Sequence, residues 1–136
     1  MAAEILIGCS LVWLIIWSIL GMKAGKEHIE WLGKIDTISK EGDLGKFWST
    51  FDGLKIKTTA HAHANSFACV AFLIGLAMKA EIIGYSLQFQ MWLAIWLFVG
   101  VVLAGIGDRF RFVPIAASGS ILFLTALIAS FVGMFV

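Results

Sequence analysis

Four long runs without a charged side chain restrict the fold of this sequence more than any other feature. They cover Ile5–Met22, Thr58–Met78, Ile82–Gly107 and Phe112–Val136. A helix that spans a membrane needs about 20 apolar residues. Inside lipid the backbone must satisfy its own hydrogen bonds, so such runs form helices. The sequence therefore predicts an all-α polytopic integral membrane protein, a single domain over residues 1–136 with spans at about 5–22, 58–78, 89–107 and 112–136.

The composition agrees with this class. The chain is 60% hydrophobic and 14% charged, whereas a soluble domain is about 45–50% apolar and about 25% charged. The formal net charge is +1, which gives no indication of a nucleic-acid partner.

The basic residues are divided unequally between the two sides of the predicted bundle. The first connection, 23–57, holds seven lysines, and the third, 108–111, holds Arg109 and Arg111, while only Lys79 lies opposite. The positive-inside rule therefore places loops 23–57 and 108–111 in the cytoplasm and both termini outside. The expected location is a bacterial inner membrane.

The first connection is amphipathic. Apolar residues recur every three positions and aromatic residues follow them, namely Ile29, Leu32, Ile35, Ile38, Phe47, Trp48 and Phe51. This pattern predicts an amphipathic first loop that lies in the cytoplasmic interface. It is either a lid or subunit contact, or a passive anchor.

Scarce polar residues converge on the cytoplasmic half of the predicted bundle. His61, His63 and Asn65 open the second span, and Ser118 and Ser120 lie near the start of the fourth. Polar clusters inside a membrane mark functional sites by default. The alternative is that the histidines are boundary residues, hydrogen-bonded between helices or to lipid headgroups.

Helical geometry separates the two histidines. His61 and Asn65 are four residues apart and share a face, whereas His63 points about 200° away from His61. One helix therefore cannot offer both histidines to one metal ion. Ala64 and Ala68 form a small-residue stripe beside His61, which allows close approach of a helix or a planar cofactor. The outward His63 needs a partner, which an oligomer interface would supply.

A single imidazole with an open position beside it favours a metal centre. Neutral imidazole suits iron, copper and zinc, and haem iron is often held by one proximal histidine. These residues alone do not choose among the metals.

The segment "TAHAHANSFACVAFLIGL" resembles the second helix of a group of small four-helix membrane proteins, among them styrene oxide isomerase and hydroxylaminobenzene mutase. The resemblance implies a homotrimer that binds haem b, with a second-helix histidine on a ferric iron that acts as Lewis acid in opening an epoxide. The ligand would be His63 if the haem lies between subunits, or His61 if it lies within one.

The hypothesis of a haem-binding isomerase also assigns roles to neighbouring residues. Ala64 and Ala68 would lie against the cofactor, and Asn65 with Ser118 or Ser120 would orient the substrate or a propionate. The substrate would be a small lipophilic molecule that enters from the membrane lipid. An alternative function is a non-catalytic haem- or quinone-associated small subunit of a larger membrane complex, and a third is a purely structural subunit.

Overall fold

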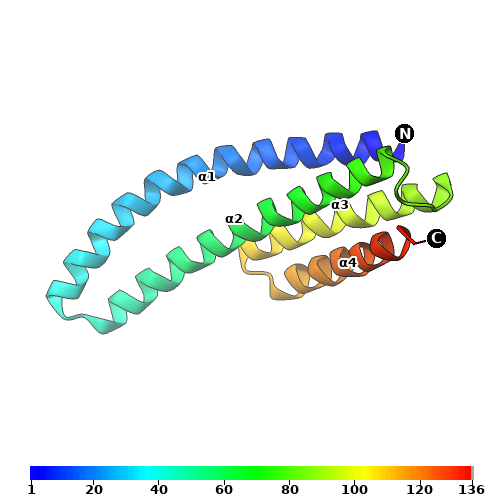
Figure 1. Ribbon diagram of the computed structural model, residues 1–136. Coiled ribbons are helices and arrows are strands. Elements are labelled where there is room, and N and C mark those ends of the chain that lie inside the picture. The colour runs from blue at the N-terminus through cyan, green and yellow to red at the C-terminus, as the bar shows by residue number, and fades with distance from the viewer. Residues whose placement is uncertain (136) are drawn as a thin grey trace.

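Four helices and three short connections make up the structure. The computed structural model describes residues 1–135; Val136, the predicted end of the fourth span, and the side chains of Ile56 and Lys57 lie outside the described part. The helices are α1 (Ala2–Glu41), α2 (Leu44–Lys79), α3 (Leu87–Phe110) and α4 (Val113–Val132). In Figure 1, α1 and α2 form a long hairpin, and the shorter α3–α4 hairpin lies beside the half of it that is nearest the N-terminus. Both termini are at the same end of the molecule.

The predicted fold class is confirmed. All four helices are long and apolar enough to cross a membrane. Large apolar side chains face outward along them, for example Val12 and Ile15, which are 58% and 59% exposed. Such side chains would be unfavourable in water and are suited to lipid. The chain is therefore an all-α polytopic integral membrane protein.

The first connection is helical over nearly its whole length, which corrects its prediction as a loop. α1 continues to Glu41 and α2 begins at Leu44. The 40 residues of α1 extend about 60 Å at 1.5 Å per residue, about twice the hydrocarbon thickness of a bilayer. The apolar positions of the first connection support this extension, because they recur at a spacing close to that of a helix. The hairpin therefore projects beyond α3 and α4 (Figure 1).

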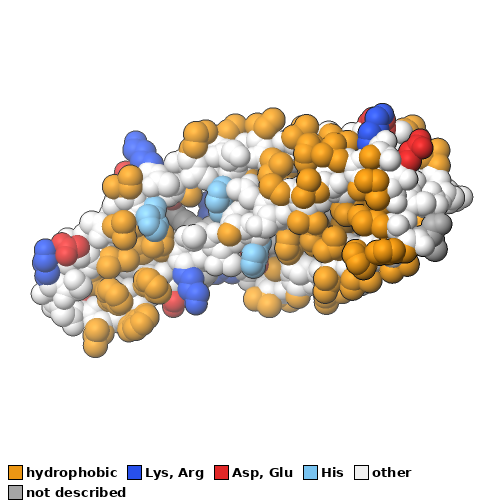
Figure 2. All heavy atoms as spheres, in the orientation of Figure 1, with side chains coloured by type: hydrophobic (Ala, Val, Ile, Leu, Met, Phe, Trp, Pro, Cys, Tyr) orange, Lys and Arg blue, Asp and Glu red, His pale blue; other side chains and the backbone are white. Residues whose placement is uncertain are grey.

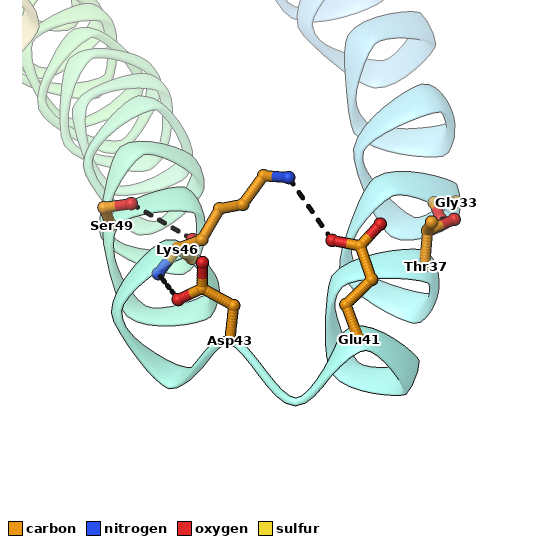
Figure 3. A network of polar contacts seen from close by, with 6 residues as sticks. All are labelled: Gly33, Thr37, Glu41, Asp43, Lys46 and Ser49. Atoms are coloured by element: carbon orange, nitrogen blue, oxygen red, sulfur yellow. Dashed lines mark hydrogen bonds and ion pairs between the residues drawn. The ribbon is translucent and has the colours of Figure 1, made fainter.

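Local signals end one long helix and begin the next. Gly42 caps α1 in the left-handed conformation, with φ of 73°, which glycine adopts without steric cost. The carboxylate of Asp43 accepts a hydrogen bond from the Lys46 backbone nitrogen at 2.9 Å and so caps α2. The Lys46 ammonium lies 3.4 Å from the Glu41 carboxylate across the turn (Figure 3). These contacts close the tip of the hairpin.

The third connection is short, as the sequence predicts, but it comprises residues 111–112 and not 108–111, because α3 continues beyond its predicted end at residue 107. α3 ends at Phe110 and α4 begins at Val113. Arg111 takes the left-handed conformation with φ of 61°, and its backbone nitrogen donates to the carbonyls of Asp108 and Gly107. Pro114 occupies the first turn of α4, where its missing N–H costs nothing. The corner makes α3 and α4 an antiparallel hairpin.

Small residues bring the helices into close contact. Ala64, Ala68 and Ala71 of α2 are fully buried. A Cβ atom placed on Gly75 would lie 2.8 Å from Cγ1 of Ile7 in α1. Ala64 lies on the α3 side, where a Cβ placed on Gly105 would lie 3.2 Å from its own Cβ. The predicted small-residue stripe therefore packs α2 against α1 and α3, as such stripes do in membranes.

An ionic contact joins the start of α1 to the end of α2. The carboxylate of Glu4, outside the predicted first span, pairs with the ammonium of Lys79. The hydrogen bond from Lys79 and that from the N-terminal amine lower the pKa of Glu4 to about 2. Because the pKa of Glu4 is lowered, the ion pair is fully formed at any pH above the ordinary carboxyl pKa. It is lost only when the pH falls through the lowered pKa.

We expect the Glu4 carboxyl to stay ionised at pH 3.5 in the folded protein. Replacing Lys79 by alanine should move its pKa up toward the ordinary range, because the largest cause of the shift is removed. A pH titration of the Glu4 side-chain carbon by NMR measures this. A pKa that is ordinary in the native chain would contradict the contact. Both side chains are exposed, so little change in stability is expected.

Candidate functional site

α2 directs its two adjacent histidines to different faces, as helical geometry predicts. The amide nitrogen of Asn65 lies 3.0 Å from Nε2 of His61, so these two side chains share the inward face. The ring of His61 also lies beside Trp17, with 6.2 Å between ring centroids. His63 is on another face and is exposed. Figure 2 shows histidine side chains at the surface in the middle of the molecule, between its apolar body and the projecting hairpin.

His63 forms the most informative polar contact between helices. Its Nδ1 lies 2.7 Å from Oδ2 of Asp108, which is 45 residues away at the end of α3. The two side chains are 51% and 24% exposed. The expectation that an oligomer interface supplies the partner of His63 is therefore corrected: Asp108 of the same chain supplies it. The reason is that α3 ends at the level where α2 carries His63.

The contact with Asp108 determines which ring nitrogen of His63 is a hydrogen-bond donor and which is an acceptor. An ionised carboxylate can only accept, so Nδ1 of His63 carries the proton. A neutral ring then leaves a lone pair on Nε2. Among the side chains that the structure describes, none hydrogen-bonds to this Nε2. Phe67 stacks against the ring, with 5.9 Å between centroids and 6° between planes, and so limits its rotation.

His63 lines a groove of about 650 Å³ between α2 and the α3–α4 corner. The groove is lined by two cations, Lys55 and Arg111, by two carboxylates, Asp52 and Asp108, and by small residues of α3 and α4. Its lining residues are Asp52, Lys55, Thr59, His63, Gly107, Asp108, Arg111, Val113, Ala116, Ala117 and Ser120. Gly107 lets α4 approach α3 closely at the wall formed by these small residues, since a Cβ there would lie 2.3 Å from the Ala116 nitrogen.

The other predicted site residues are divided between the groove and the interior. Ser120 lines the groove with His63. The hydroxyl of Ser118 donates to the Pro114 carbonyl at 2.8 Å and does not line the groove. Ala64 and Ala68 are fully buried in helix packing, so they are not available to a ligand in the groove.

Four charged residues of the groove lie outside the predicted set of site residues. Asp52 and Lys55 belonged to the segment predicted as a loop, and Arg111 to the predicted corner. Asp108 lies in the predicted connection 108–111, directly after the third predicted span and level with the histidines, and this position is the signal in the sequence that could have found it.

Residues 1–135 contain no site at which protein side chains alone could hold a metal ion. No three histidine, cysteine, aspartate or glutamate side chains come together there. Cys9 and Cys69 are both free. The structure instead has one imidazole, that of His63, hydrogen-bonded to the carboxylate of Asp108. This arrangement suits a metal whose other ligands belong to a cofactor.

The fold and the site together define a class: a polytopic membrane protein of four helices with a histidine–aspartate pair on a groove beside the helix ends. Comparisons with protein family models, with curated proteins and with solved structures gave no match.

Proposed function

We propose that the chain is a haem-binding membrane protein of the isomerase type, in which His63 is the single protein ligand of the iron. The observation that carries this proposal is the 2.7 Å contact between Nδ1 of His63 and the carboxylate of Asp108. Histidines that bind metals almost always donate their other N–H to a carboxylate, carbonyl or water. The contact orients the ring and leaves Nε2 as the nitrogen available to a metal.

The groove also carries two cations that could pair with the two carboxylates of haem b, namely Lys55 and Arg111. Of its own two carboxylates, Asp108 is bonded to His63, and Asp52 is the other. The wall of Ala116, Ala117 and Gly107 suits a flat apolar ring. His61 is a poorer ligand, because its Nε2 is already bonded to Asn65. These observations favour His63 over His61.

Ferric haem with one protein ligand supplies a Lewis acid at its open position. The residues of the chain supply orientation. The hydroxyl of Ser120 is the neutral polar group on α4 that lines the groove and can hold a polar atom of a substrate. Asn65 is turned inward to His61, so its expected role in orienting the substrate is replaced by one in positioning His61. The substrate is a small lipophilic, epoxide-like molecule that the bilayer concentrates.

We also propose an oligomeric state and a membrane location for the protein. The groove lies on the outside of the single chain, so further copies in a homotrimer would cover it. The bacterial inner membrane, with residues 23–57 and 108–111 on the cytoplasmic side, is the proposed location. It is supported by the nine basic residues at that end against Lys79 at the other.

An absorption spectrum of protein purified from haem-supplied cells tests the proposed function. We expect a Soret band in the native chain, its loss in His63→Ala and its retention in His61→Ala. A Soret band that survives in His63→Ala, or its absence from the native protein, would overturn the proposal. A six-coordinate, redox-active spectrum would instead favour the non-catalytic haem- or quinone-associated subunit.

A further inference from the structure

A small crevice lies between α1 and α3, apart from the groove of His63. Its volume is about 70 Å³. The most deeply buried residue of its lining is Trp17 of α1. This ring packs on α3, where a Cβ placed on Gly105 would lie 3.4 Å from Cζ2 of Trp17. Leu20 also lines the crevice and is exposed. The crevice therefore opens outward from the contact between α1 and α3.

Two cations from different helices line this crevice. They are Lys23 of α1 and Arg109 of α3, and both are exposed. Among the side chains that the structure describes, neither has an ion-pair or hydrogen-bond partner. The carboxylate in the lining, Glu27, already has an interaction of its own. Two like charges on one crevice repel each other, so an anion between them is favoured.

Both cations lie where a charge-free run ends. Lys23 follows the run Ile5–Met22 directly, and Arg109 lies two residues after the run that ends at Gly107. α1 and α3 run in the same direction (Figure 1), so these two ends lie on the same side of the membrane. The apolar runs match the hydrocarbon core. The cations therefore lie at the level of the lipid headgroups.

The two parallel helices carry the same pattern of side chains on the membrane side of the crevice. In each helix, two aliphatic residues precede the cation by seven and three positions, so all three share a face. The residues are Ile16, Leu20 and Lys23 on α1, and Val102, Ile106 and Arg109 on α3. Seven residues of helix are about 10 Å long. Each cation thus stands at the end of an apolar track that extends into the lipid.

We propose that the crevice is a binding site for an anionic phospholipid, whose phosphate lies between Lys23 and Arg109 and whose acyl chain follows the two apolar tracks. Basic pockets between membrane-spanning helices bind anionic headgroups in this way. The small volume suits a single phosphate group. A lipid is favoured over a free phosphate because the apolar tracks lead directly to the two cations.

Native mass spectrometry of the full chain in a neutral detergent tests the site. The protein is titrated with dioleoyl phosphatidylglycerol, which is anionic, and with dioleoyl phosphatidylcholine, which has the same acyl chains and phosphate but no net charge. We expect one molecule of the anionic lipid per chain, bound at least about fivefold more tightly than the neutral lipid, which is the usual contribution of one cation at a membrane surface. Equal binding of the two lipids would overturn the proposal.

A pair of double variants shows whether the crevice holds the lipid. Lys23→Gln with Arg109→Gln removes both charges and should weaken binding of the anionic lipid by about 25-fold, or about fivefold for each cation. Lys26→Gln with Lys34→Gln removes the same charge from exposed positions of α1 outside the crevice. This control should bind within about threefold of the native chain, because exposed charges elsewhere are screened. An equal loss in both double variants would mean that only overall charge attracts the lipid, and would overturn the site.

Glycerol phosphate distinguishes a lipid from a free phosphate, because it has the same phosphate group but no acyl chain. In large excess it should leave the bound phosphatidylglycerol in place. Displacement of the lipid would show that the crevice takes a soluble phosphate, which would contradict the proposal. None of these results depends on haem or on His63.

Discussion

Replacing Gly119 by alanine is expected to disrupt the packing of α4 on α3 and to destabilise the protein by about 3 kcal/mol or more, at the upper end of the cost of overpacking. The added Cβ would lie 2.3 Å from the backbone nitrogen of Ala104 and 2.8 Å from Cβ of Leu103. Backbone atoms of a helix cannot rotate away as a side chain can. The hairpin must separate to accept the methyl group, and it then loses contact along its length.

The matched control for this change is Gly8→Ala in α1. Its Cβ meets no atom within 4 Å, and alanine favours a helix by about 1 kcal/mol over glycine. Unfolding in a mixed detergent series, followed by circular dichroism, should show Gly119→Ala unfolding far earlier than Gly8→Ala. Equal stability of the two variants would show that α3 and α4 do not cross this closely.

Replacing Asp108 by asparagine is expected to lower the affinity for haem by about 10–100-fold, which is the usual effect of removing a partner behind a metal ligand. The change keeps the size of the side chain but removes its charge. The amide can also turn its NH₂ toward Nδ1, which would shift the ring proton to Nε2 and block the ligating lone pair. This result rests on the proposed function of His63.

The control for this second change is Asp52→Asn, which removes the same charge from the lining of the same groove. Haem titration of the purified proteins, followed at the Soret band, should separate the two variants. Asp52→Asn should bind haem within about threefold of the native chain, because its carboxylate is not bonded to His63. If both variants lose haem equally, the loss reflects the charge of the groove and not the orientation of His63.

The number and class of the helices could be predicted because lipid permits few structures. An apolar run of about 20 residues must satisfy its own backbone hydrogen bonds, so it becomes a helix. The predicted start of the fourth span, Phe112, is the residue that caps α4. The Asp108–Arg111 corner was also predictable, since few residues separate two such runs.

The helical state of residues 23–57 was harder to predict. The segment contains Gly25, Gly33, Gly45 and Gly53, and glycine lowers helix propensity. Packing between the two helices overrides that propensity: Ile38 is 6% exposed, and Trp31 packs on Gly53. Contacts of this kind appear only when both helices are placed together.

The contacts of His61 and His63 also differ in how far the sequence predicts them. The pairing of His61 with Asn65 is local, so a helical wheel predicts it. The pairing of His63 with Asp108 joins residues 45 apart. It depends on the rotation of α2 and on the depth at which α3 ends, and neither is fixed by the apolar pattern.

The positions of the turns have a consequence for biogenesis. Gly42 and Asp43 separate α1 from α2, and Arg111 and Phe112 separate α3 from α4. Each helix can therefore meet its neighbour as soon as both have left the ribosome, and such local contacts form quickly. The chain can insert as two successive hairpins. In the proposed orientation, the lysine-rich tip of the first hairpin does not have to cross the bilayer. The second hairpin then brings Asp108 to a histidine that the first hairpin already carries.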